Sequence, residues 1–233
     1  MIDRRCPRIQ IAGVLDREEA LLLARLGVDS IGLPLRLAVH PEDISEAEAA
    51  SIVHTLPGGV RAVLITYLTA PDEISALCDT LGVTCVQLHA DMTAATLATL
   101  KATRPELYVI KSLIVPPAPD AKAMRRMEQR VLALAGHCDA FLTDTFDPST
   151  GATGATGKVH DWAVSRRLAE LSPLPLILAG GLNPDNVRQA ILAVRPAGVD
   201  AHTGVESRDG RKDPVLVAAF VEQALAGFET LLH

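Results

Sequence analysis

The chain has 233 residues, of which 48% are hydrophobic and 21% are charged, so it has enough apolar side chains for a large core. Its formal net charge is −6 and its Lys and Arg residues form no run, which argues against a nucleic-acid partner or an anionic membrane surface. The first residues contain no apolar run before a cleavage site, and no stretch reaches about 18 apolar residues, so the sequence predicts a cytoplasmic protein that spans no membrane.

Short apolar runs alternate with longer amphipathic stretches along the whole chain. The runs are rich in Val, Ile and Leu and mostly lack polar alternation, which is typical of strands buried on both faces of a parallel sheet. The expected strands cover residues 9–12, 30–33, 62–65, 85–88, 108–111, 140–143, 176–179 and 198–200. The helices expected between them cover residues 17–26, 45–56, 71–81, 92–103, 121–135, 164–171, 184–194 and 214–225.

Residues that favour helix starts stand where this scheme needs them. Asp16 and Ser45 are placed as N-caps, and Ser45 begins a Ser-Glu-Ala-Glu capping box. Pro184 and Pro214 suit first helical turns. Eight strands alternating with eight helices predict an α/β fold, a (β/α)8 TIM barrel forming a single domain over residues 1–233. A six-stranded open sheet with misassigned strands is the structural alternative.

Glycine-containing segments follow the seventh and eighth expected strands. Gly180 and Gly181 leave backbone N–H groups accessible to an anion, just before an expected helix N-terminus. Thr203 and Gly204 follow the eighth strand, and barrels frequently bind phosphate at these two loops. A tight turn without a ligand is the alternative for each segment. His202 either faces this ligand or bonds to local backbone.

A small and glycine-rich segment covers residues 145–160. Gly154, Thr156, Gly157 and Lys158 lie within it, and such a loop is able to close over an anionic substrate. It is not a Walker loop, because Val159 follows the lysine. An ordinary surface loop is the alternative.

Ionisable residues stand at the ends of the other expected strands. Asp144 directly follows the sixth strand and is placed to transfer a proton. His89, Lys111 and Asp200 lie at the ends of the fourth, fifth and eighth strands. A charged Lys or Asp inside a barrel needs a partner or a ligand, which favours a functional role over a packing role.

These segments, in this order, resemble the phosphoribosylanthranilate isomerase family of tryptophan biosynthesis. The resemblance is carried by Val86-Gln87-Leu88-His89, Val109-Ile110-Lys111, Asp144-Thr145, Gly154-Ala155-Thr156-Gly157-Lys158, Leu178 to Pro184 and Gly204-Val205-Glu206. It implies a TIM barrel, a small phosphorylated substrate and an Amadori rearrangement of an aminoaldose to an aminoketose. It also implies Asp144 as general acid, with phosphate contacts at Gly180, Gly181, Thr203 and Gly204. We expect no metal and no organic cofactor, and a monomer or a homodimer.

Two positions depart from the family pattern. Ala12 stands where the resemblance implies a Cys general base, and alanine accepts no proton. Glu42, after His40 and Pro41, stands where it implies an Arg that binds the anthranilate carboxylate, while Arg36 is near in sequence. His40, Glu42 and His89 are then the candidates for a replacement base.

Two other functions remain open from the sequence. One is a different barrel chemistry on a phosphorylated small molecule, such as that of an aldolase, epimerase or lyase, with Lys111 forming a Schiff base. The other is a non-catalytic phosphometabolite-binding protein or assembly subunit, for which Ala12 and Glu42 are the motivation.

Overall fold

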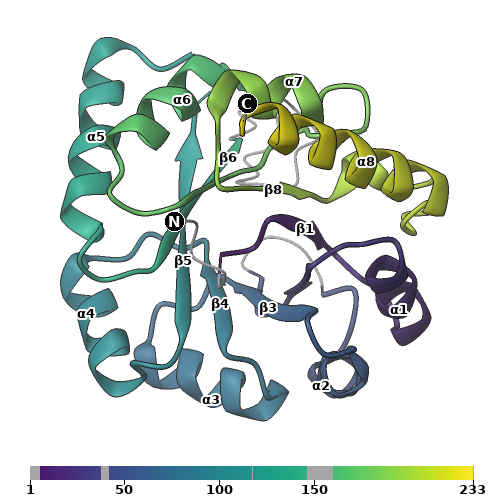
Figure 1. The fold of residues 1–233 in the computed structure, drawn as a ribbon. Helices are drawn as coiled ribbons and strands as arrows, with labels where there is room; N and C mark the ends of the chain where they lie inside the picture. Colours follow the sequence, from purple (N-terminus) through teal and green to yellow (C-terminus); the bar gives the residue numbers. More distant parts are fainter. Residues whose placement is uncertain (1–5, 38–41, 117, 146–159, 233) are drawn as a thin grey trace.

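The structure is a computed structural model that describes residues 6–37, 42–116, 118–145 and 160–232. Parallel strands form a closed barrel in which each strand pairs with the next along the chain and β8 pairs with β1 (Figure 1). The strands are β1 (Ile9–Ala12), β2 (Ser30–Pro34), β3 (Arg61–Thr66), β4 (Cys85–Leu88), β5 (Tyr108–Val115), β6 (Ala140–Thr145), β7 (Leu176–Leu178) and β8 (Gly198–Ala201).

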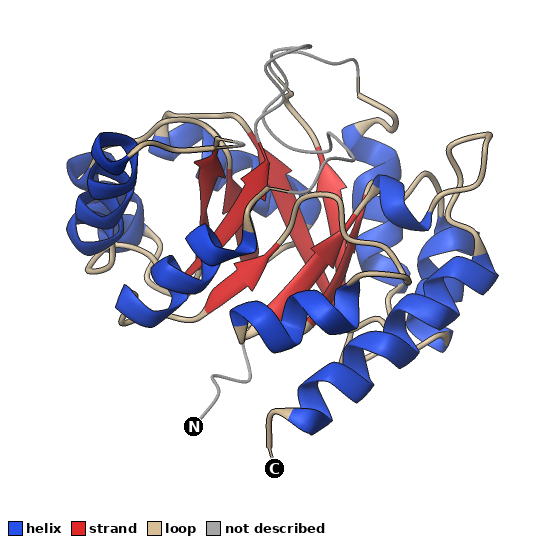
Figure 2. Cartoon of the chain, turned by 90° about the horizontal axis from the view of Figure 1, so that it is seen from above, coloured by secondary structure: helices blue, strands red, loops and turns tan. Residues whose placement is uncertain are grey.

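Helices follow the strands and form a ring outside the barrel, as Figure 2 shows from above. They are α1 (Arg17–Arg25), α2 (Glu46–Thr55), α3 (Pro71–Leu81), α4 (Ala94–Thr103), α5 (Ala121–Leu134), α6 (Trp162–Leu171), α7 (Val187–Val194) and α8 (Pro214–Thr230), with the short 3-10 helix η1 (Thr203–Val205) after β8. The predicted single-domain (β/α)8 barrel is confirmed, and the open-sheet alternative is wrong. Over the described ranges, no helix has the length and apolar character that crossing a membrane requires.

Local side-chain chemistry sets most helix starts. Asp16 accepts a hydrogen bond from the Glu19 backbone, and Ser45 forms the predicted capping box with Glu48. The segment before α7 differs from the prediction. There the Asn183 backbone N–H donates to the Asn186 side chain, so Pro184 lies in a turn and the helix begins three residues later than expected.

Two layers of buried side chains show which way each strand residue faces. The inner layer fills the barrel and includes Ala12, Val63, Ile110 and Leu142. The outer layer packs the strands against the helices. Because side chains of a strand alternate between the two faces, this assignment decides which residues reach the barrel mouth.

Candidate active site

A small polar cavity lies at the carboxyl ends of β6, β7 and β8, where barrel enzymes bind their substrates. Both glycine segments predicted to bind phosphate line it, and so do two carboxyl groups. The lining residues are Asp144, Ala179, Gly180, Gly181, Leu182, Asp200, Ala201, His202, Thr203 and Gly204. The structure therefore brings the four predicted phosphate-binding residues together around one space.

Close backbone packing explains why glycine stands in these two segments. A Cβ on Gly204 would lie 1.9 Å from the carbonyl oxygen of Leu182, so the two turns touch and leave no room for a side chain. Gly180 has φ +94°, and a Cβ there would lie 2.1 Å from Thr145 Oγ1. Among the backbone hydrogen bonds between described residues, none uses the N–H of Gly181, Thr203 or Gly204, so these donors are open to an anion.

Two buried carboxyl groups lie beside this space. Asp144 accepts a hydrogen bond from the Thr145 backbone N–H at 2.7 Å, and burial raises its pKa to about 6. Asp200 is 7% exposed, and its Oδ1 atom has no hydrogen-bond partner among the described residues. Burial and then the charge of Asp144 raise the pKa of Asp200 to about 8, against the smaller effects of the Gln10 amide and Lys212. At neutral pH the two carboxyls therefore share about one proton.

A chain of side-chain amides crosses the barrel beneath the carboxyls. Gln10 Nε2 donates to Gln87 Oε1 at 2.8 Å, and Gln87 Nε2 lies 2.8 Å from His89 Nε2. Since the Gln87 amide nitrogen has only hydrogens to offer, His89 Nε2 accepts and the ring carries its proton on Nδ1. Burial, and then the charge of Lys111, lowers the pKa of His89 to about 3. This arrangement favours His89 as a neutral hydrogen-bond donor rather than as the base predicted from sequence.

The residues that depart from the family pattern lie at β1 and after β2. Ala12 is buried at the end of β1, in the inner layer. Glu42 accepts a hydrogen bond from the Arg36 backbone N–H at 2.6 Å, and the Arg36 guanidinium pairs with Glu46. The Glu42 carboxylate and the Arg36 guanidinium therefore both have partners near the start of α2. His40 lies outside the described residues.

The Lys111 side chain is buried and held by backbone carbonyls, and it lines part of a cavity at the ends of β3 to β5, so its predicted Schiff-base role stays untested. It lies between Ile110 and Ser112 on β5, and Ile110 belongs to the inner layer, so Lys111 faces the helices. Its Nζ donates to the carbonyls of Leu88 and Ser112 at 2.9 and 2.7 Å. Burial lowers its pKa to about 7.

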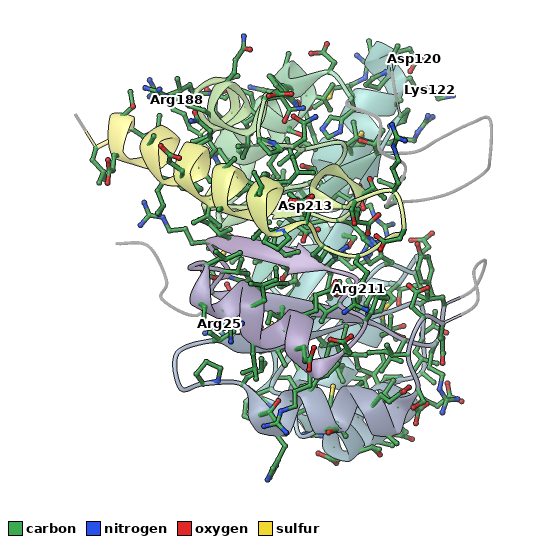
Figure 3. All side chains as sticks on the ribbon, turned by 90° about the vertical axis from the view of Figure 1, so that its right-hand side faces the viewer. Arg25, Asp120, Lys122, Arg188, Arg211 and Asp213 are labelled. Carbon is green, nitrogen blue, oxygen red and sulfur yellow. The ribbon has the colours of Figure 1, made fainter. Side chains whose placement is uncertain are left out.

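One buried and one exposed ion pair hold the turn after β8 in place. Lys212 Nζ donates to Glu206 at 2.5 Å and to the His202 carbonyl at 3.3 Å, while the Lys212 backbone N–H donates to the buried Glu19. Figure 3 shows Arg211 beside α1, where it pairs with Asp16 at 2.5 Å. Burial, and then Lys212, lowers the pKa of His202 to about 3, so a neutral His202 lines the cavity.

One buried histidine was missed by the sequence analysis. His160 Nδ1 lies 2.9 Å from Thr145 Oγ1, and its Nε2 lies 2.6 Å from Ser165 Oγ, which donates to Thr143 Oγ1 at 3.0 Å. This network joins the end of β6 to α6 on either side of residues 146–159. The predicted substrate-loop residues Gly154, Thr156, Gly157 and Lys158 lie outside the described residues.

We expect His160 to make folding sensitive to acid. Burial lowers the pKa of His160 to about 4. Between pH 6.5 and 4, His160 therefore binds a proton in the unfolded chain but stays neutral in the folded chain. The free energy of unfolding should therefore fall by about 3 kcal/mol more in the wild type than in His160→Gln between pH 6.5 and 4. Chemical denaturation at the two pH values measures this difference. His54→Gln, which removes an exposed histidine of α2, is the control; equal losses in the wild type and His160→Gln would contradict the prediction.

Fold and site together define a class, the (β/α)8 barrels with a polar cavity at the ends of β7 and β8. The family model for N-(5'phosphoribosyl)anthranilate (PRA) isomerase matches residues 10–223. N-(5'-phosphoribosyl)anthranilate isomerase 2 of Methanosarcina mazei is 39% identical, with 95% of each chain covered. The chain belongs to the N-(5'-phosphoribosyl)anthranilate isomerase family.

Solved structures of this family have the same fold. The phosphoribosyl anthranilate isomerase of Thermotoga maritima has a TM-score of 0.78 and 29% identity, covering 95% of this chain and 100% of that one. A phosphoribosyl anthranilate isomerase solved in complex with reduced 1-(O-carboxyphenylamino)-1-deoxyribulose 5-phosphate has a TM-score of 0.76 and 27% identity, with the same coverage. That ligand contains a phosphate, a sugar chain and an aromatic carboxylate.

Proposed function

We propose that this chain is an intramolecular oxidoreductase of tryptophan biosynthesis that isomerises N-(5'-phosphoribosyl)anthranilate to the corresponding aminoketose. The observation that carries the proposal is the single cavity that joins the two glycine turns to a buried pair of carboxyl groups. Membership in the isomerase family supports the same reaction. An Amadori rearrangement needs anchoring of the sugar, one acid and one base.

The glycine turns supply the anchor. Gly181, Thr203 and Gly204 line the cavity, and the phosphate accepts hydrogen bonds from their unused backbone N–H groups. Holding the phosphate at β7 and β8 places the sugar ring over the adjacent carboxyl groups of β6 and β8. The anchor thereby turns a flexible substrate into one positioned for proton transfer.

The carboxyl pair supplies the acid and the base. In the reactive form the shared proton lies on Asp144 and Asp200 is ionised, which is the less populated form because Asp200 has the higher pKa. Asp144 donates this proton to the ring oxygen, and the bond from that oxygen to C1 breaks as the nitrogen lone pair forms a C=N bond. Asp200, which has the higher proton affinity, takes the hydrogen from C2 as a proton, and the released electron pair forms the C1=C2 bond of an enol while the C=N pair returns to nitrogen. The enol hydroxyl proton then leaves and C1 gains one, giving the ketone and restoring the shared proton. Ala12 takes no part in this scheme.

The shared proton predicts a bell-shaped dependence of kcat/KM on pH. Below about pH 6 both carboxyls are protonated and no base remains, whereas above about pH 8 both are ionised and no acid remains. Initial rates between pH 5 and 9 should show a plateau between those values. Asp200→Asn should lower kcat/KM by about 10²- to 10⁴-fold at every pH, because its amide accepts no proton from C2. A flat profile in the wild type, or wild-type kcat/KM in Asp200→Asn, would argue against the shared proton.

The decisive test of the function is turnover by the purified chain. We expect isomerisation of N-(5'-phosphoribosyl)anthranilate, measured by loss of substrate fluorescence, and growth of a tryptophan auxotroph that lacks the isomerase. A binder without catalytic activity would instead be stabilised by the substrate and give no product. The Schiff-base alternative would require Lys111 Nζ to leave the Leu88 and Ser112 carbonyls that accept its hydrogen bonds.

A further inference from the structure

A second and larger cavity lies across the barrel mouth from the phosphate site, at the ends of β3, β4 and β5. Its volume is about 420 Å³, within the range of roughly 300–1,000 Å³ typical of small-molecule sites. One wall comes from α5, which stands beside α4 on the left of Figure 1. The lining residues are Tyr67, His89, Ala90, Asp91, Lys111, Ser112, Leu113, Ile114, Met127 and Arg130. None of them has a role in the acid–base steps above.

The chemistry of this cavity fits a flat ring. Tyr67 and His89 stack with their ring centroids 5.3 Å apart and their planes inclined by 28°. Leu113 and Met127 add apolar surface. Aromatic and thioether side chains make favourable contacts with an aromatic ligand, so the walls suit an aryl group.

Polar atoms in the same cavity lack partners. His89 Nδ1 and Ser112 Oγ are buried and form no hydrogen bond with any described residue. His89 Nδ1 donates, since the amide chain places the His89 proton on this atom, and the Ser112 hydroxyl has a hydrogen to donate. A buried donor without an acceptor destabilises the protein unless a ligand supplies the acceptor. A ligand with oxygen atoms would accept these hydrogen bonds.

Arg130 supplies a positive charge at this cavity. It pairs with Asp91 and reaches the Met92 carbonyl at 3.4 Å. The Asp91 side chain is 86% exposed, so the pair is weak and a ligand carboxylate is able to take the place of Asp91. Arg36, by contrast, is paired with Glu46 near α2 and does not line this cavity.

We propose that this cavity binds the aryl half of the substrate, an aromatic ring bearing a carboxylate, and that Arg130 of α5 binds that carboxylate. The inference rests on the proposed isomerase function and assigns the end of the substrate opposite its phosphate. The ring lies against Tyr67 and His89, while the carboxylate forms a charge-assisted pair with the guanidinium. The specificity for an aromatic acid thus comes from α5.

The test compares Arg130→Gln with Arg126→Gln, which removes an exposed arginine one turn earlier on the same helix. In Arg130→Gln we expect KM for the substrate to rise about 10- to 100-fold, with kcat changed less than about threefold. The Kd of the reduced product analogue should rise by the same factor and that of inorganic phosphate should not change. Arg126→Gln should match the wild type. An active wild type with equal KM values in both variants overturns the inference and leaves the isomerase function standing.

Anthranilate alone gives a readout that does not depend on turnover. Its fluorescence titration should show binding to the wild type that Arg130→Gln weakens at least about tenfold. Equal affinity in the two proteins, or no binding to the wild type, overturns the assignment of the cavity. Absence of turnover together with Arg130-dependent binding of anthranilate instead rejects the isomerase function and retains the site for an aromatic acid.

Discussion

Asp144→Asn is expected to lower kcat by about 10²- to 10⁴-fold, because the amide has the shape of the carboxyl but gives no proton to the ring oxygen. Asp144 Oδ1 accepts a hydrogen bond from the Thr145 backbone N–H, and the side-chain oxygen of an asparagine is able to accept the same bond. The Kd of the reduced product analogue should therefore stay within a few-fold of the wild-type value. Single-turnover kinetics and calorimetric titration measure the two quantities separately.

Asp72→Asn provides the matched control for this change. Asp72 is exposed in the first turn of α3 and lines neither of the two cavities. It should leave both kcat and binding unchanged. Wild-type turnover in Asp144→Asn would remove Asp144 from the mechanism, whereas loss of both turnover and analogue binding would point to a collapsed site.

Gly204→Ala should abolish the phosphate anchor. The added Cβ would lie 1.9 Å from the Leu182 carbonyl oxygen and 3.0 Å from Asn183 Cβ, so the turn after β8 must move away from the turn after β7. Separating the turns breaks at least two hydrogen bonds to the phosphate, and charged hydrogen bonds contribute about 1.5–3 kcal/mol each. We expect KM to rise on the order of 10²-fold or more, with inorganic phosphate losing its ability to inhibit.

Gly136→Ala is the control for a new methyl group. No heavy atom lies within 4 Å of a Cβ built there, so KM and the thermal midpoint should stay at their wild-type values. Thermal unfolding of Gly204→Ala separates a local change of the site from a loss of fold. A folded Gly204→Ala protein with wild-type KM would show that the phosphate binds elsewhere.

The barrel and the meeting of the two glycine turns were predictable because their signals are local. The apolar runs and the capping residues Asp16 and Ser45 mark the elements, and the glycine turns follow two consecutive strands. In a barrel, consecutive strands are neighbours, so the two turns had to meet. Family membership then gave the reaction type.

The rest depends on which face each side chain occupies. Residues 108–115 form a continuous run in which Lys111 has no alternating pattern around it, so the sequence did not show that it faces the helices. His160 was missed because its partners come from β6 and α6, which meet only in the folded chain. Arg130 was missed for the same reason, since α5 lies next to β5 and the turn after β4 only once the barrel closes.

The amide chain from Gln10 through Gln87 to His89 has a consequence for isotope labels. Amide groups do not relay protons, so we expect protons of the proposed carboxyl pair to exchange with bulk water through the open end of the barrel and not along this chain. When bound substrate covers that end, we expect a hydrogen removed from C2 to return to C1 more often than it exchanges with solvent. The interior amides thus favour internal transfer of a hydrogen over its exchange with solvent.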